Sequence, residues 1–298
     1  RSVTCYFMNP VRIRGAAAAA QRDHDVRHFV VDHMSGLNAV LEEIDASRSV
    51  IFARMAVHHD AAMVDLSTKF GAKPADIPPI LDAIAKAGAE PALAFNVGSV
   101  VMSPDAFVHA LETAKQVLDA LDFKIRLVDI GGGYPKSYPG FEAPPLDEYF
   151  EAIRNSVRLP LADDGELMAE PGRALSARGM SAVARVLLRK EDRLYLNDGM
   201  YGAFWELRFK GHVRYAARAF RDGAPLAGAT QDFHLYGPTC DSSDAMPGEV
   251  ELPADIDVGD HIEFGSIGAY SLSGRTDFNG FYSDAVVEIS SGEAWPAS

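Results

Sequence analysis

The sequence is poor in cysteine and lacks long apolar runs. Its 298 residues contain only two cysteines, Cys5 and Cys240. Two cysteines cannot form a disulfide framework, so we expect a reducing cytoplasm. No uninterrupted apolar run approaches the ~20 residues that span a bilayer, and the polar residues near the N-terminus do not fit a signal peptide. We therefore expect no membrane partner.

Positive charge and metal-ligand patterns are also scarce. The net charge of −14 would repel the phosphates of a nucleic acid or of an anionic membrane, so neither is an expected partner. A cationic substrate would be weakly attracted. The nine histidines show no metal-ligand spacing, so we expect no metal site.

The first half of the chain alternates short apolar runs with longer helical ones. Six expected strands alternate with five expected helices, which favours a parallel sheet with helices outside, either a (β/α) barrel or a doubly wound sheet. The expected strands are Val3–Met8, His28–Asp32, Val50–Met55, Pro91–Val97, Lys124–Ile130 and Glu166–Ala169. The expected helices are Gly15–Arg22, Ser35–Ile44, Ile77–Ala87, Pro104–Leu121 and Leu146–Val157.

The pattern changes near Ser181, where short strands separated by turns replace the helices. We therefore expect a barrel domain over residues 1–180 and a β-rich domain over residues 181–298. The segment Arg218–Thr230 is interpreted as a polar loop. The expected strands of this half are Val183–Leu188, Arg193–Asn197, Phe233–Tyr236, His261–Phe264 and Ala285–Ile289.

The run Leu127–Pro135 reads LVDIGGGYP and ends an apolar strand in three glycines. Gly131, Gly132 and Gly133 carry no Cβ atom, so their backbone can take positive φ and approach a ligand closely. Several N–H groups at such a strand end can point at one anion, which predicts a phosphate cradle. A plain tight turn explains the same residues, and the spacing does not match a dinucleotide-binding fingerprint.

Two other strand ends carry polar groups, where barrel folds place their active sites. The run AEPGR supplies Glu170 and Arg173, and arginine suits bidentate phosphate binding. An internal Glu–Arg ion pair is the alternative. The run FNVGS supplies Asn96 and Ser99, with a hydroxyl and open backbone amides, although a turn alone would also explain it.

The loop GPTCDSSD joins the thiol of Cys240 to the carboxylate of Asp241. A buried, inert cysteine is the usual case, but a polar loop makes a functional thiol a comparable alternative. Tyr270 could donate a hydrogen bond to a phosphate, and aromatic packing would explain it equally well.

Five motifs in this order and spacing resemble the ornithine decarboxylases, which are pyridoxal-phosphate (PLP) enzymes of the alanine-racemase-like fold, related to diaminopimelate and arginine decarboxylases. The resemblance runs from about Val3 to Ile289. It implies a (β/α)8 barrel with a C-terminal β domain, working as a homodimer with active sites at the subunit interface. The motifs are LVDIGGGYP, AEPGR, YLNDGMYGAF, YGPTCDSSD and GAYSLSGRTDFNGF.

The resemblance also implies roles for single residues. Glu170 would pair with the pyridine nitrogen and keep it protonated, so that the ring withdraws electrons. Cys240 would enter the neighbouring subunit's site and guide protonation after CO2 loss, and Asp241 would contact the distal amine of the substrate. The cofactor-binding set would comprise Arg54, Asn96, Ser99, Gly131, Gly132, Gly133, Glu170, Arg173 and Tyr270.

The sequence departs from the family pattern at three places. The family's cofactor lysine lies in a Tyr-Ala-x-Lys strand, which this sequence lacks; Val3–Met8 corresponds to the third barrel strand. We therefore expect six of the eight barrel strands, with the first two βα units and the lysine outside this sequence. Asn96 stands where a histidine usually stacks on the PLP ring. Lys210 replaces an aspartate that reads the distal amine, and a cation there would repel a diamino acid.

These motifs predict a PLP-dependent decarboxylase of a basic amino acid, most simply ornithine to putrescine in polyamine synthesis. Lys210 leaves open another substrate, such as lysine, arginine or a polyamine precursor. The missing lysine and Asn96 leave open a non-catalytic, decarboxylase-like protein that binds a regulatory partner. The retained phosphate set opposes this last alternative, since a pure binding protein has no use for it.

Overall fold

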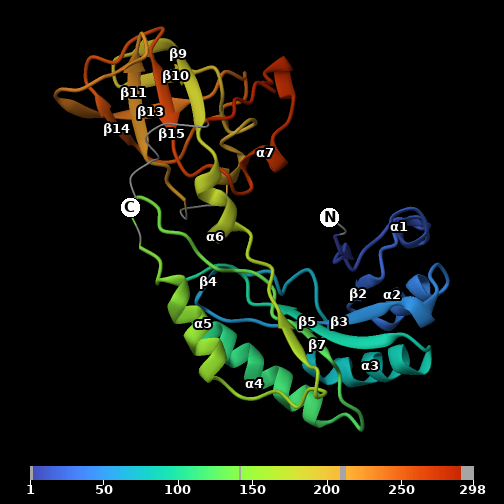
Figure 1. Cartoon of the computed structure of the whole chain (residues 1–298). Helices are drawn as coiled ribbons and strands as arrows, with labels where there is room; N and C mark the ends of the chain where they lie inside the picture. Colours follow the sequence, from blue (N-terminus) through green and yellow to red (C-terminus); the bar gives the residue numbers. More distant parts are fainter. Residues whose placement is uncertain (1–2, 141, 209–212, 290–298) are drawn as a thin grey trace. The chain divides into compact units, whose positions relative to one another are not determined.

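Apolar runs form strands and amphipathic runs form helices in the first part of the chain (Figure 1). The structure is a computed structural model and describes residues 3–140, 142–208 and 213–289. The chain divides into two compact units. The first comprises residues 1–135 and 144–171, and the second comprises residues 136–143 and 172–298.

The first unit is built on a sheet of six parallel strands in the order β1-β2-β3-β5-β7-β8. Within the described residues, β1 and β8 each pair on one side only. Strands β4 and β6 are not part of this sheet and form a separate antiparallel pair. The strands are β1 (Tyr6–Phe7), β2 (His28–Val31), β3 (Val50–Ala56), β4 (Ala62–Val64), β5 (Glu90–Asn96), β6 (Ser99–Val101), β7 (Leu127–Asp129) and β8 (Glu166–Met168).

The helices of this unit follow from the spacing of their apolar residues. In α4, buried residues recur every three or four positions, as in Phe107, Leu111, Ala114 and Leu118. In α3, Pro78 and Pro79 lie in the first turn, where a missing N–H costs nothing. The helices are α1 (Ala16–His24), α2 (Met34–Leu41), α3 (Ile77–Lys86), α4 (Asp105–Asp119) and α5 (Leu146–Asn155), with 3-10 turns η1 (Ala46–Arg48) and η2 (Pro74–Asp76).

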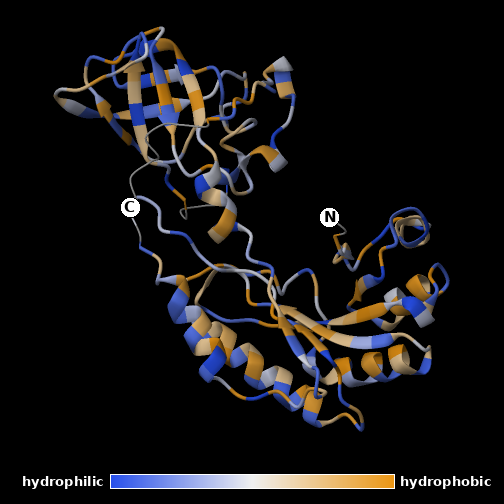
Figure 2. Cartoon of the chain, in the orientation of Figure 1, coloured by the Kyte–Doolittle hydropathy of each residue, from blue (hydrophilic) through white to orange (hydrophobic). Residues whose placement is uncertain are grey.

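The central strands are buried on both faces, which explains their almost continuous apolar sequences (Figure 2). Helices α3 and α4 lie along one face of the sheet, and α2 packs against α3 (Figure 1). Alternate residues of the strands form an apolar cluster that includes Val30, Phe52 and Ala94. Parallel strands with helices along one face form a barrel wall, so the barrel prediction is confirmed and the doubly wound alternative is wrong.

The second unit contains a seven-stranded sheet in the order β12-β11-β15-β9-β10-β13-β14, which confirms the predicted β-rich region. All neighbours are antiparallel except β10 and β13. The strands are β9 (Ala182–Lys190), β10 (Arg193–Leu196), β11 (Ala217–Arg221), β12 (Ala224–Pro225), β13 (Thr230–Tyr236), β14 (Val250–Pro253) and β15 (His261–Phe264). The helical turns are α6 (Arg173–Ser176), η3 (Ala177–Gly179), η4 (Trp205–Arg208), α7 (Ser271–Gly274) and η5 (Phe278–Gly280).

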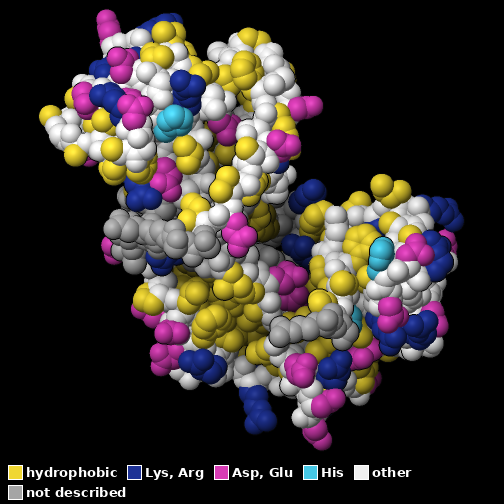
Figure 3. All heavy atoms as spheres, turned by 45° about the horizontal axis from the view of Figure 1, so that its top comes forward, with side chains coloured by type: hydrophobic (Ala, Val, Ile, Leu, Met, Phe, Trp, Pro, Cys, Tyr) yellow, Lys and Arg dark blue, Asp and Glu magenta, His cyan; other side chains and the backbone are white. Residues whose placement is uncertain are grey.

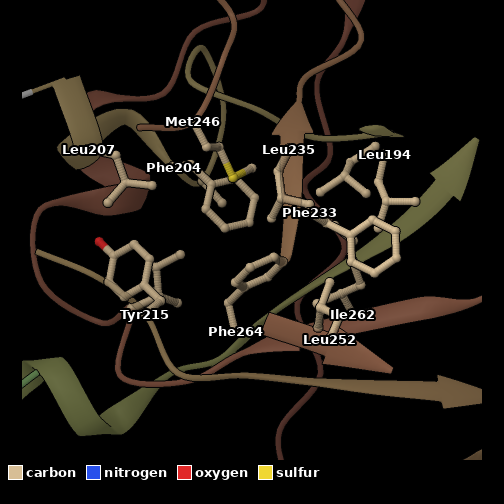
Figure 4. Close-up of a cluster of buried hydrophobic side chains, with 14 of the residues drawn as sticks. Leu194, Phe204, Leu207, Tyr215, Phe233, Leu235, Met246, Leu252, Ile262 and Phe264 are labelled. Carbon is tan, nitrogen blue, oxygen red and sulfur yellow. The ribbon is translucent and has the colours of Figure 1, made fainter. Parts of the chain in front are cut away.

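One cluster of buried apolar side chains forms the core of this unit (Figure 4). Phe204 and Phe264 meet edge to face, with ring centroids 4.7 Å apart. Tyr215 lies at one side of the cluster, and its hydroxyl points away from Phe264 (Figure 4). That hydroxyl therefore needs a polar partner inside the unit.

Two sequence predictions for this half are wrong. The segment Arg218–Thr230 is not a loop, because most of it forms the β11–β12 hairpin around Asp222 and Gly223, both at positive φ. Its polar residues alternate with buried ones such as Ala219, which is the pattern of a half-exposed strand. Ala285–Ile289 forms no strand and is exposed; its apolar residues have no neighbouring strand to pair with among the described residues.

Acidic and basic side chains are interspersed on the visible face of each unit (Figure 3). The negative charge is therefore spread out rather than concentrated in one patch of that face. No helix in the described part of the chain has the length and hydrophobicity needed to cross a membrane.

Candidate functional site

The carboxyl ends of β5, β7 and β8 are joined by backbone hydrogen bonds between the loops that follow them. Ile130 N–H donates to the carbonyl oxygen of Met168 at 2.9 Å, and Glu170 N–H donates to that of Gly131 at 2.8 Å. Val101 N–H donates to the carbonyl oxygen of Gly133 at 3.0 Å. Parallel strands end at the same edge of a sheet, so these three loops form one surface.

The glycine run is required by this close packing. A Cβ atom on Gly131, Gly132 or Gly133 would lie less than 3.0 Å from a backbone oxygen of a neighbouring loop. Gly131 and Gly133 also have φ of 69° and 105°, a conformation that favours glycine. The structure thus supports the tight-turn interpretation directly, and the phosphate cradle stays a proposal.

Two carboxyl groups meet beside this turn. Asp129 is only 2% exposed, and its Oδ1 accepts a hydrogen bond from Gly131 N–H at 2.8 Å. Burial raises the pKa of Asp129. Although Glu170 as a residue stays exposed, partial burial of its carboxyl and the nearby Asp129 raise its pKa to about 7. The Glu170 carboxyl therefore keeps its proton in slightly acidic solution and donates it to Asp129 in a hydrogen bond.

Arg54 on β3 is a cationic group close to this pair. Burial lowers its pKa, while Glu170, Asp32 and Asp129 raise it, so the guanidinium remains charged. A cavity of about 20 Å³ lies between these groups, which is room for about one water molecule. Its lining residues are Met8, Val30, Arg54, Ala94, Phe95, Asn96, Asp129 and Glu170.

Asn96 is the last residue of β5, and Ser99 is the first residue of β6. Asn96 Oδ1 accepts a hydrogen bond from Gly98 N–H at 2.9 Å, so its carbonyl oxygen fixes the turn. Val100, next to Ser99, is buried with φ of 51°, which is a strained conformation for a β-branched residue. Such strain is typical of functional loops.

In the second unit, Arg173 lies in a buried polar cluster. Its Nη2 pairs with Oε1 of Glu206, and its Nη1 donates to the hydroxyl of Tyr138 at 3.1 Å. The hydroxyl of Tyr215 donates to the other oxygen of Glu206 at 3.1 Å. Arg173 thus forms its ion pair with Glu206 and not with Glu170, its neighbour in the AEPGR run.

Tyr270 lies beside Arg173. The guanidinium carbon is 5.1 Å from the centre of the Tyr270 ring, within range of a cation–π interaction. Burial lowers the pKa of Arg173, but its hydrogen bonds and neighbouring charges raise it above the ordinary value. The guanidinium is therefore charged at any pH of interest.

The loop with Cys240 and Asp241 follows β13 and is braced by Asp244. The buried Asp244 carboxylate accepts hydrogen bonds from Thr239 N–H at 3.0 Å and from Met200 N–H at 2.7 Å. Cys240 is exposed, so the buried, inert interpretation is wrong. Its Sγ lies 3.1 Å from Oδ1 of Asn279.

Asp241 is oriented by the hydroxyl of Tyr201, which donates a hydrogen bond to its Oδ2. This bond and a second one from Ser243 lower the pKa of Asp241, so its carboxylate is ionised. Lys210 lies outside the described residues. No group of side chains suited to holding a metal ion is found in residues 3–140, 142–208 and 213–289.

A family described as "pyridoxal-dependent decarboxylase, pyridoxal binding domain" matches residues 3–177. The chain belongs to the pyridoxal-dependent decarboxylases. The lysine/ornithine decarboxylase of Selenomonas ruminantium is 30% identical over 285 residues, covering 93% of this chain and 70% of that protein. The ornithine decarboxylase of Caenorhabditis elegans is 28% identical over 316 residues, with 97% and 72% covered.

A solved structure supports the same assignment. The crystal structure of an SrLDC mutant in complex with PLP has a TM-score of 0.82 and 29% identity, and the match covers 93% of this chain and 71% of that one. The chain is thus a member of a family of PLP-dependent lyases that act on basic amino acids, and the recognition made from the five motifs is confirmed.

The residues of this decarboxylase fit PLP. In the second unit, the buried Nε of Arg173 has no hydrogen-bond partner among the described residues, so the guanidinium has donor capacity left for an anion. In the first unit, Glu170 is a carboxyl group with a raised pKa beside an open loop surface, which suits a partner that is itself cationic. When bound, PLP supplies an electron-withdrawing ring.

Sequence reasoning did not single out four residues that the structure brings to these groups: Asp129, Tyr138, Glu206 and Asn279. Asp129 and Glu206 carried a usable signal, since each is an acid inside an apolar run (LVDI and AFWEL). Asn279 lies within the motif GAYSLSGRTDFNGF, but its contact with Cys240 cannot be found from the sequence, because the two residues are distant along the chain. The same holds for Tyr138 and its partner Arg173.

Proposed function

We propose that this decarboxylase removes CO2 from ornithine to form putrescine for polyamine synthesis. The observation that carries the proposal is the ionised Asp241 carboxylate on the Cys240 loop. An ionised carboxylate attracts the distal ammonium group of a basic amino acid. Cys240, which is exposed next to it, would deliver a proton to the carbon that loses CO2.

The resemblance implies which residues would hold the cofactor. Gly131, Gly132 and Gly133, with Ser99, would direct backbone and hydroxyl donors at the phosphate, and Arg173 and Tyr270 would add charge and a phenol. Glu170, once ionised, would accept a hydrogen bond from the protonated ring nitrogen, and Asp129 lies beside it. Asn96 would pack on the ring, with Arg54 nearby.

We further propose that the protein is a cytoplasmic homodimer in which Cys240 and Asp241 act in the neighbouring subunit's site. The two cysteines are free and exposed, which suits a reducing compartment. The dimer rests on the resemblance.

The substrate is tested by measuring CO2 release from ornithine, lysine and arginine by the natural gene product supplied with PLP. Ornithine should have the highest kcat/KM. Asp241→Asn should raise KM for ornithine at least about tenfold, with a smaller effect on kcat, because it removes a charged interaction worth roughly 1.5–3 kcal/mol. Ser242→Ala, at the next and exposed position, is the control and should leave KM unchanged.

The outcomes separate the alternatives. Preferred release from lysine or arginine would contradict ornithine and point to Lys210 as a specificity residue. No release from any of the three, with PLP bound, would contradict catalysis and favour a regulatory binding protein.

A further inference from the structure

The polar cluster around Arg173 is unusual for the interior of a β-sheet unit. Arg173, Glu206, Tyr138 and Tyr215 are 6%, 5%, 3% and 7% exposed, and they border the apolar cluster that contains Phe204. A buried ion pair is costly to desolvate and is often no more stable than an apolar replacement. A function other than stability therefore has to account for it.

We propose that Glu206 is a positioning residue, which holds Arg173 in place so that its remaining N–H groups bind the phosphate of the cofactor. This inference rests on the role of Arg173 in the proposed function. It assigns Glu206 a part in cofactor binding without contact between Glu206 and the cofactor.

The hydrogen-bond inventory of Arg173 supports this assignment. A guanidinium has five N–H groups. One on Nη1 is used by Tyr138 and one on Nη2 by Glu206, while Nε is without a partner in the described residues. Three N–H groups thus remain, and a phosphate engages an arginine through two of them.

Glu206 is itself fully engaged. Its two carboxylate oxygens accept from Arg173 and from Tyr215. Burial first, and then Glu206, raise the pKa of the Tyr215 hydroxyl, so that it stays protonated and keeps donating. The pair is neutral overall, which allows Arg173 to be buried and oriented before any anion arrives. A preformed site binds its ligand more tightly because less order has to be created on binding.

The test compares Glu206→Ala and Glu206→Gln in the full-length protein. The dissociation constant of PLP is measured by fluorescence titration, and that of inorganic phosphate by competition, at a temperature where every variant is folded. Glu206→Ala should weaken both at least about tenfold, because Arg173 loses its anchor. Glu206→Gln keeps an oxygen for Nη2 and an NH2 group for Tyr215, so it should bind within about threefold of the unchanged protein.

Asp260→Asn is a matched control in the same unit. Asp260 is 4% exposed and binds Arg221 through both oxygens, at 2.9 and 2.7 Å, with no part in the candidate site. It should lower Tm and leave both dissociation constants within about twofold. Unchanged binding by Glu206→Ala, or equal loss in Glu206→Gln and Glu206→Ala, would overturn the inference.

The result is independent of the catalytic assay. If PLP binds and no amino acid is decarboxylated, the proposed function fails and the binding comparison still stands. If the unchanged protein binds neither PLP nor phosphate, the inference is overturned whatever the assay shows.

Discussion

The two units handle charge near their candidate residues in opposite ways. In the first unit, the carboxyl groups of Asp129 and Glu170 face each other beside a single guanidinium, Arg54, and the balance is reached by keeping a proton. In the second unit, Arg173 is paired with Glu206, and both oxygens of that acid are bonded. The first arrangement can change with pH or with a cationic partner, whereas the second cannot.

The difference follows from how the two sheets are built. Parallel strands all end at one edge, so polar side chains gather there close to solvent, and their charges can adjust by taking up a proton. The interior of the β unit is apolar, so a cation placed there must have its partner built in. We call the first unit responsive, because its carboxyl groups can change protonation. We call the second unit preorganised, because its ion pair is complete before any ligand binds.

The largest expected effect comes from breaking the buried ion pair of Arg173 and Glu206. Arg173→Met should lower the free energy of unfolding by about 3–5 kcal/mol, because it leaves the Glu206 carboxylate buried without its cation. Urea unfolding followed by circular dichroism measures this change. Arg218→Met is the control: Arg218 and Glu263 form a more exposed pair in the same unit, for which about 0–1 kcal/mol is expected. A loss below about 1 kcal/mol for Arg173→Met would refute the preorganised character of the second unit.

The sequence predicts most of the first unit because each of its elements carries its own signal. The expected helix Ile77–Ala87 and strand Pro91–Val97 differ from α3 and β5 by one residue at their ends. Their boundaries are set by local chemistry, namely the prolines that start the helix and Gly88 that ends it.

The sequence predicts less where structure depends on distant partners. β11 alternates polar and apolar residues over only five positions, and its pairing with β15 joins residues about 45 apart. Of the candidate site, the glycine run and the acid–arginine motif can be found from sequence. The pairing of Arg173 with Glu206 cannot, because the two residues are brought together only by the folding of the β unit.

The second prediction tests the responsive character of the first unit. The folded pKa of Glu170 is about 7 against an ordinary value of 4.5. Between these values the folded chain holds a proton that the unfolded chain has lost, so stability should fall as pH rises through this window. Thermal unfolding without ligand should show a Tm that decreases from pH 5 to 7 by on the order of a few degrees.

Glu170→Gln should remove this decrease, because the amide does not titrate. Glu166→Gln, at the exposed start of β8, four residues before Glu170, is the control and should retain it. A Tm that rises from pH 5 to 7 in the unchanged chain would contradict the shared proton of Asp129 and Glu170.

The smallest expected effect uses one cysteine from each unit. Cys5 and Cys240 are both exposed, but the thiol of Cys240 lies 3.1 Å from the Asn279 side-chain oxygen and can donate to it. A reagent must break this weak bond before it reaches the sulfur, so Asn279→Ala should speed alkylation of Cys240 by about two- to threefold. Mass spectrometry after iodoacetamide treatment gives both rates in one sample, with Cys5 as the internal reference. An unchanged ratio of the two rates would show that Asn279 does not hold the thiol of Cys240. It would also count against the view that the second unit presents its candidate residues in fixed positions.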